Sequence, residues 1–187
     1  MMAVTPQAQA ASELCIGEHA VAKLRDAAVL AAPPSRTGIY AHSLETAASV
    51  LFTTIAAGDI AVHLGKFGPD QNHHYGRAFA GWHQEKSLAL PAAQRRDCWR
   101  GAWNDMSLGT GLSFVGHTAI ATVSGFIVDV ASVTGASLCP CCPYVVLDLQ
   151  TPSPEAAARY RGRRVTVPPR GKKWTSGPPT TVSDPRT

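Results

Sequence analysis

The sequence predicts a mainly α protein, with three or four helices, a small strand element after a cysteine cluster, and an extended basic C-terminal tail. Three observations support this class. Apolar residues recur at helical spacing in the first half, a long uncharged stretch occupies the middle, and proline and basic residues accumulate after residue 150. The length of 187 residues suits one mainly helical domain over residues 1–150, followed by a Pro-rich basic tail over 151–187.

Two helices are expected in the first 65 residues. Ser12 can cap the first, which runs to about Ala32 and stops at two prolines, and its apolar face carries Leu14, Val21, Leu24 and Ala28. Ser43 can cap the second, which ends at Gly58 or Gly65, and its apolar face carries Leu44, Ala47, Ala48, Leu51 and Ile55.

A loop and a third helix are expected next. Residues 65–80 contain Gly, Pro, Asp and Asn at a density typical of a loop. Pro91 suits the first turn of a helix that runs to about Met106. The apolar stripe of this helix consists of Ala92, Trp99, Ala102, Trp103 and Met106.

The central stretch Leu108–Leu149 has two acids and no Lys or Arg, so we expect it to be buried. Its apolar spacing fits a helix, whereas the residues from Ile120 to Val130 also alternate like a strand. β-branched residues favour the strand and length favours the helix. A membrane span over residues 111–128 is a further reading, against which polar residues and Asp129 count. Val145–Leu147 reads as a short buried strand, and residues 155–159 as a helical turn.

Three of the five cysteines, Cys139, Cys141 and Cys142, form a Cys-Pro-Cys-Cys run. Thiolates at this spacing can converge on one soft metal ion; the alternative is that they are unreactive, partly buried side chains. A fourth ligand would come from upstream, from Cys98, His117, or the group His73, His74 and His83. The first 14 residues lack the features of a secretory leader, which predicts an intracellular, reducing compartment and a protein that is not secreted.

The run LCPCCPYVVLDL, followed by YRGRRVTVPPR, resembles the metal-claw segment of the nitrile hydratase and thiocyanate hydrolase family. A second run, KFGPDQNHHYGRAFAGWHQEKSLAL with the later WNDMS, is similar to the opening of that family's other subunit. The matching claw residues are Leu138, Cys139, Cys141, Pro143, Tyr144, Val146, Leu147 and Leu149, then Tyr160, Arg161 and Arg163 with a one-residue shift.

The resemblance implies a metal held by three thiolates and two backbone nitrogens, acting as a Lewis acid on a nitrile or a water. Ala136 replaces the first claw cysteine. Pro140 replaces the serine whose amide binds the metal, and proline has no amide hydrogen to lose. The claw would therefore be inactive, or would hold its metal differently through Cys142. The residues that would orient the ligands are Arg161 and Arg163.

Positive charge concentrates between residues 159 and 173, which contain seven basic residues and no acid. Such a tail can lie across another protein subunit, or can bind nucleic acid or anionic lipid by neutralising phosphates. A solvated tail is the alternative. The residues expected to contact a partner are Arg159, Arg164, Arg170, Lys172, Lys173 and Trp174.

These observations predict a non-catalytic accessory or assembly subunit, held in a larger complex by its buried central segment and its basic tail. No Gly-x-Ser-x-Gly, phosphate-binding loop or dinucleotide motif is present. The first alternative is a thiolate-metal hydratase resembling nitrile hydratase, with cobalt, iron or zinc as the metal. The second is a membrane-associated subunit with one span near residues 111–128.

Overall fold

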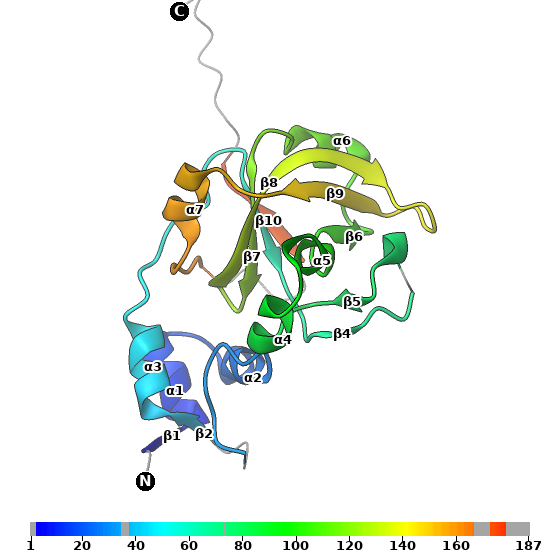
Figure 1. Cartoon of the computed structure of the whole chain (residues 1–187). Helices are drawn as coiled ribbons and strands as arrows, with labels where there is room; N and C mark the ends of the chain where they lie inside the picture. Colours follow the sequence, from blue (N-terminus) through cyan, green and yellow to red (C-terminus); the bar gives the residue numbers. More distant parts are fainter. Residues whose placement is uncertain (1–2, 35–37, 73, 167–172, 179–187) are drawn as a thin grey trace, which may run out of the picture.

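The computed structural model describes residues 3–34, 38–72, 74–166 and 173–178. The chain forms a mixed α/β fold around a six-stranded sheet of order β10-β3-β7-β8-β9-β6 (Figure 1). The predicted mainly α class is therefore wrong. The strands of this sheet are β3 (Ile60–His63), β6 (Gly101–Trp103), β7 (Thr118–Val123), β8 (Phe126–Leu138), β9 (Val145–Gln150) and β10 (Trp174–Ser176).

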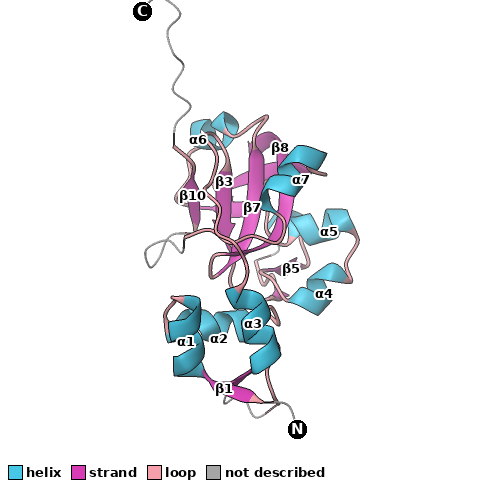
Figure 2. Ribbon diagram, turned by 90° about the vertical axis from the view of Figure 1, so that its left-hand side faces the viewer, coloured by secondary structure: helices cyan, strands magenta, loops and turns pink. Residues whose placement is uncertain are grey.

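Smaller elements surround this sheet. Two short antiparallel pairs join β1 (Val4–Pro6) to β2 (Gly38–Tyr40) and β4 (Gly68–Pro69) to β5 (Phe79–Ala80). The helices are α1 (Gln7–Leu14), α2 (Glu18–Asp26), α3 (Ala41–Ala48), α4 (Gln84–Leu88), α5 (Ala92–Asp97), α6 (Leu108–Ser113) and α7 (Pro154–Tyr160), with a 3-10 turn η1 (His74–Gly76). Figure 2 shows α1, α2 and α3 grouped at one end of the molecule.

The central strands are buried on both faces. Alternate residues such as Ile60, Ala119 and Ala131 belong to the larger apolar core, which also contains side chains from α1, α2 and α3. The intervening residues Ala61 and Ile120 pack in a second, smaller core, whose members also include Val130, Tyr160 and Val165. Helix α7 therefore lies on the side of the smaller core, whereas α1, α2 and α3 lie at one end of the sheet (Figure 2).

The central stretch folds as a strand hairpin and not as a long helix. After the short α6, β7 and β8 pair in antiparallel fashion, and β7 also pairs in parallel with β3. All six residues of β7 are buried. Because no polar face exists, the usual alternation of polar and apolar residues is absent from this strand. Within the described residues, every helix is too short or too polar to cross a membrane.

The first predicted helix is two helices. Cys15 adopts a left-handed conformation with φ 54°, and Gly17 follows it as the N-cap of α2, so the chain turns between them. Ser43 lies inside α3, where its Oγ accepts a hydrogen bond from the amide of Ala31 at 2.9 Å. Only the first part of the predicted third helix forms, as α5. The chain enters β6 four residues after α5 ends, so the helix does not reach Met106.

The segment predicted as a basic tail contributes two elements to the fold. The helical turn expected at residues 155–159 is confirmed as α7, capped by the Oγ of Ser153, which accepts from the amide of Ala156 at 3.1 Å. Residues 174–176 form β10, which pairs antiparallel with β3 at the sheet edge. The expected strand at residues 145–147 is also confirmed, as the start of β9.

Candidate metal centre

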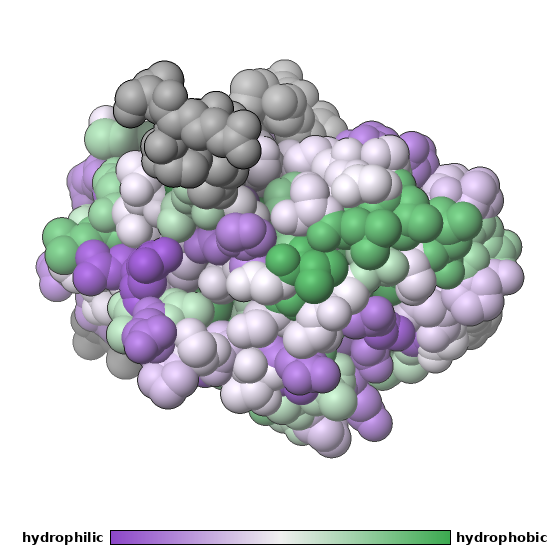
Figure 3. Space-filling view, turned by 90° about the horizontal axis from the view of Figure 1, so that it is seen from above, coloured by the Kyte–Doolittle hydropathy of each residue, from purple (hydrophilic) through white to green (hydrophobic). Residues whose placement is uncertain are grey.

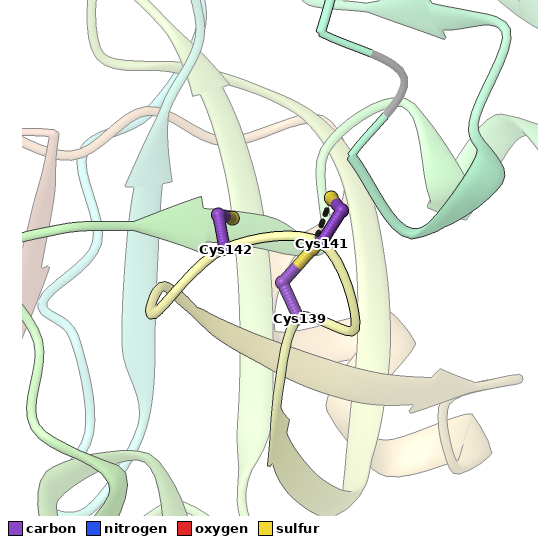
Figure 4. Close-up of side chains that lie close together, drawn as sticks. All are labelled: Cys139, Cys141 and Cys142. Atoms are coloured by element: carbon purple, nitrogen blue, oxygen red, sulfur yellow. Dashed lines mark hydrogen bonds between the residues drawn. The ribbon is translucent and has the colours of Figure 1, made fainter.

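The three clustered cysteines lie in the turn that joins β8 to β9. Leu138 pairs with Val145 as the last rung of the ladder, and the amide of Cys139 donates to the carbonyl of Tyr144 at 2.7 Å. The amide of Cys142 donates to the carbonyl of Cys139 at 3.3 Å. The turn therefore curls back on itself and brings its side chains to one place (Figure 4).

The three sulfur atoms lie within 4.8 Å of one another, so they could hold one metal ion. The Sγ atoms of Cys139 and Cys141 are 3.1 Å apart. A tetrahedral zinc site with Zn–S bonds of ~2.3 Å needs sulfurs ~3.8 Å apart. Small rotations of the cysteine side chains would therefore bring the sulfur atoms to the spacing that a tetrahedral zinc site needs. Cys139 is buried, Cys142 is half-buried and Cys141 is exposed, so the group opens to solvent on one side.

The thiol of Cys139 loses its proton more readily than an ordinary cysteine thiol. Burial raises the pKa of Cys139, but hydrogen bonds from the thiol and amide of Cys141, the thiol of Cys142 and the amide of Tyr75 bring it down to about 7. The pKa of Cys142 is raised, chiefly by burial and by the neighbouring Cys139 thiolate. Near neutral pH about half of the molecules therefore carry the Cys139 thiolate, the form that binds metals, and a metal would displace the remaining protons.

A polar loop between β4 and β5, anchored by the buried Asp70, packs over the cysteine turn. The carboxylate of Asp70 accepts hydrogen bonds from the amides of Asn72 and His74, from the Nδ1 of His74 and from the Nε of Arg77. Tyr75 has a left-handed φ of 43°, and its hydroxyl donates to the carbonyl of Asp97 at 2.7 Å. These contacts hold the Tyr75 amide where it reaches Cys139.

The sequence predicted the three thiol ligands and a loop over residues 65–80, but not the contact between them. Asp70 and Arg77 lie more than 60 residues before Cys139, and no local spacing relates them to the cysteines. The only signal was the density of Gly, Pro, Asp and Asn, which indicates a loop but not its partner. The ring of His74 lies 5.9 Å from the ring of Tyr144, so this part of the loop reaches the start of β9.

Within the described residues, no fourth ligand joins the cysteines. Cys98 is buried beside α5, where its thiol contacts the carbonyl of Gln94 at 3.3 Å. His117 lies 3.9 Å from Asp59 instead. His83 precedes α4, and its Nδ1 is buried without a hydrogen-bond partner. His73 lies outside the described residues.

The two arginines expected to orient the ligands lie at the other end of β8. The carbonyl of Arg163 accepts from the amide of Ile127 at 3.0 Å, near the first residue of that strand. Cys139 follows the last residue, roughly 40 Å of strand away. Arg161 is the C-cap of α7 and is exposed. The structure therefore does not bring Arg161 or Arg163 to the cysteines.

The residues expected to bind a partner have different environments. Arg159 is exposed on α7, and Lys173 is exposed and donates to Asn104. Trp174 is partly buried in β10 and packs edge-on against Phe114, with ring centroids 6.0 Å apart. Arg164 is 9% exposed and belongs to the interior. Arg170 and Lys172 lie outside the described residues.

Comparison of the chain with known protein families, curated proteins and solved structures found no match. The similarity to nitrile hydratase therefore stays a prediction from the sequence. Ala136 pairs with Leu147 in the β8–β9 ladder, three residues before the turn, and Pro140 lies inside the turn. The chemistry of the site follows from Cys139, Cys141 and Cys142 alone.

Proposed function

We propose that this protein binds a soft transition-metal ion, with Zn²⁺ as the first candidate, through Cys139, Cys141 and Cys142. The observation that carries the proposal is the convergence of three sulfur atoms within 4.8 Å on one turn. Thiolates select soft and borderline ions over Mg²⁺ or Ca²⁺. Three protein ligands leave the fourth position of a tetrahedral ion open, as in zinc sites that bind water or substrate.

The open fourth coordination position determines which molecule the bound ion can act on. Because Cys141 is exposed, a water molecule or a ligand from another molecule can reach the ion from that side. A bound water would be polarised by the metal. The hydratase alternative uses the same position, with cobalt or iron in place of zinc, although Ala136 and Pro140 remove two of that family's ligands.

The test is elemental analysis of the purified full-length protein, combined with titration of the metal-free protein with Co²⁺. Thiolate coordination gives Co²⁺ an intense charge-transfer absorption, which reports the ligands directly. We expect one metal per chain, and loss of both metal and absorption in the Cys139→Ser, Cys141→Ser double variant. Cys15→Ser is the matched control, because Cys15 is also a free, exposed thiol. Equal metal retention by the double variant and this control would refute the site.

A second candidate function is an accessory subunit held by an apolar contact. Exposed apolar side chains form a band on the face of the molecule seen in Figure 3. Leu108, Leu112 and Val115, on α6 or directly after it, are 36%, 50% and 42% exposed, and Leu138, next to the cysteine turn, is 53% exposed. Apolar side chains gathered in this way are typical of surfaces that contact another protein.

The accessory role is tested by light scattering and by isolation of the untagged protein from its native host. We expect a complex larger than one chain that dissociates in the Leu112→Ser variant. Ala157→Ser on α7, away from this surface, is the control. A protein that stays monomeric and without partners would leave the metal proposal standing and remove the subunit proposal.

A further inference from the structure

An apolar pocket lies away from the cysteine turn, between the N-terminal helices and the β7–β8 turn. It has a volume of about 380 Å³, within the range typical of small-molecule sites. Its walls come from three places: the corner between α1 and α2, the turn between β7 and β8, and the chain around residue 164. The apolar side chains that line it are Ile16, Phe52 and Phe126.

The pocket is lined on one side by Arg164, a buried cation that has no counter-ion among the described residues. Arg164 is 9% exposed, and its guanidinium lies 4.0 Å from the centre of the Phe52 ring and 5.6 Å from the centre of the Phe126 ring. Its Nη1 donates to the carbonyl of Leu14 at 3.1 Å, but its Nε is buried with no hydrogen-bond partner. Among the described residues, no carboxylate lies within ion-pair distance of it. A buried charge left in this state is costly, and an anion would relieve it.

The backbone holds Arg164 firmly in this position. Its amide donates to the carbonyl of Leu51 at 3.0 Å, and its carbonyl accepts from the amide of Thr53 at 2.8 Å. The next residue, Val165, donates to the carbonyl of Gly125 at 2.8 Å. The guanidinium is thus presented to the pocket by a fixed segment, which favours binding because little order must be imposed when a ligand arrives.

The N-terminus of α2 supplies a second feature suited to an anion. This helix has nine residues, its N-cap Gly17 lines the pocket, and no side chain caps its free amides. Free amides and the helix dipole favour a negative group at such a place. Glu18 occupies the first turn but is exposed and does not line the pocket.

We propose that this pocket binds a small amphipathic anion, a carboxylate with an apolar body. The head group lies against the guanidinium of Arg164, beside Gly17 at the N-terminus of α2. The body lies against Ile16, Phe52 and Phe126. This site involves none of the metal-binding cysteines, so it is independent of the metal proposal.

The first experiment is calorimetric titration of the full-length, metal-free protein with octanoate. Octanol has the apolar body without the charge, and inorganic phosphate has the charge without the body. We expect octanoate to bind at least tenfold more tightly than either. Equal binding of octanol would overturn the role of the charge, equal binding of phosphate would overturn the ligand class, and no binding of octanoate would overturn the site.

A matched pair of variants locates the head group. A side chain at Gly17 meets no atom within 4 Å of its Cβ, and the φ of −74° suits an N-cap, so Gly17→Asp and Gly17→Asn both cap α2 without strain. Only Asp adds a negative charge at the proposed head-group position. We expect Gly17→Asp to weaken octanoate binding at least tenfold and Gly17→Asn by less than threefold. Equal affinities in the two variants would overturn the proposal.

The thiol of Cys15 reports occupancy of the pocket. Cys15 is exposed and lines the same pocket, whereas Cys141 is exposed on the metal-binding turn. We expect octanoate to slow alkylation of Cys15 by iodoacetamide severalfold, as measured by peptide mass spectrometry, and to leave alkylation of Cys141 unchanged. Unchanged alkylation of Cys15 at saturating octanoate would place the ligand elsewhere and overturn the assignment.

Discussion

The hydroxyl of Tyr160 donates a hydrogen bond of 2.6 Å to the Oδ2 of Asp59, across 101 residues of sequence. Both side chains are buried, at 0% and 4% exposure. Asp59 precedes β3 and also accepts, through its Oδ1, from the amide of Thr118 at the start of β7. The same tyrosine hydroxyl accepts from the amide of Ala56 at 2.9 Å. One contact therefore ties α7 to the beginning of both central strands.

The Tyr160→Phe variant tests how much this contact stabilises the fold. Removal of the hydroxyl leaves the buried Oδ2 of Asp59 without its donor and the partly buried amide of Ala56 without its acceptor. We expect a loss of about 2–4 kcal/mol in the free energy of unfolding, measured by urea denaturation. Tyr144→Phe is the control, because the Tyr144 hydroxyl makes no hydrogen bond within the described residues, and it should change stability by less than ~0.5 kcal/mol. Similar losses in both variants would contradict the interpretation.

The parts of the fold that sequence predicted are those set by local patterns. The strand at residues 145–147 and the helical turn at 155–159 carry composition signals that act within a few residues. The same kind of signal predicted a loop over residues 65–80, but it did not indicate the β4–β5 strand pair that the structure forms there. The grouping of Cys139, Cys141 and Cys142 is local for the same reason. Contacts such as Tyr160 with Asp59, or β10 with β3, join distant segments and leave no such pattern.

The sequence left helix and strand open for the central stretch, because β7 is buried on both faces and therefore has no polar face to mark it as a strand. One local signal was nevertheless present. Ser124 and Gly125 form the two-residue loop between β7 and β8, and both have positive φ, 48° and 88°. A two-residue loop of this kind is the commonest hairpin connection, and Ser-Gly is among the dipeptides that mark turns. This dipeptide signal indicates a turn at Ser124 and Gly125, which would have divided the helix considered for the central stretch.

The buried ion pair between Asp70 and Arg77 should stabilise the loop over the cysteine turn. Burial raises the pKa of Asp70, but the hydrogen bond and charge of Arg77, with donors from His74 and Asn72, lower it overall. This stability is present above the unfolded carboxyl pKa of about 4 and is lost as pH falls below it. We expect Arg77→Met to cost about 3 kcal/mol in urea denaturation at pH 7, because Asp70 is left charged and buried.

The control for Arg77→Met is Arg95→Met. Arg95 contacts Asp129 at 3.2 Å in a more open setting, and Asp129 keeps a hydrogen bond from the indole of Trp99. We expect a cost of about 1 kcal/mol there. The Asp70→Asn, Arg77→Met double variant should be more stable than Arg77→Met alone, since the unpaired charge is gone. A double variant less stable than either single variant would contradict this account.

His63 should make the sheet edge sensitive to acid. Its Nδ1 lies 2.8 Å from the Oγ1 of Thr122 in β7, and its Nε2 lies 3.1 Å from the Oγ1 of Thr175 in β10. Burial lowers its pKa from 6.5 to about 4. The unfolded chain therefore binds more protons between these values, so stability is full above pH 6.5 and falls as pH drops toward 4.

We expect this titration to remove about 2 kcal/mol between pH 6.5 and 4, a value reduced for the partial exposure of the ring. His63→Gln keeps a hydrogen-bonding side chain without a charge change, so its stability should fall by about 2 kcal/mol less than that of the wild type over this range. Urea denaturation at a series of pH values measures both, and the exposed His19→Gln variant is the control. Parallel curves for wild type and His63→Gln would contradict the assignment.

Metal binding should stabilise the cysteine turn, because the folded turn presents three thiols together and the unfolded chain does not. At a free Zn²⁺ concentration 100 times the Kd, the free energy of unfolding should rise by about 2.7 kcal/mol, and chelation should remove this gain. The gain should shrink as pH falls well below the Cys139 pKa of about 7, because protons then compete with the metal. The Cys139→Ser, Cys141→Ser double variant should show no gain at any pH, measured by urea denaturation with and without metal. A zinc effect of equal size in that variant would mean that the ion binds elsewhere.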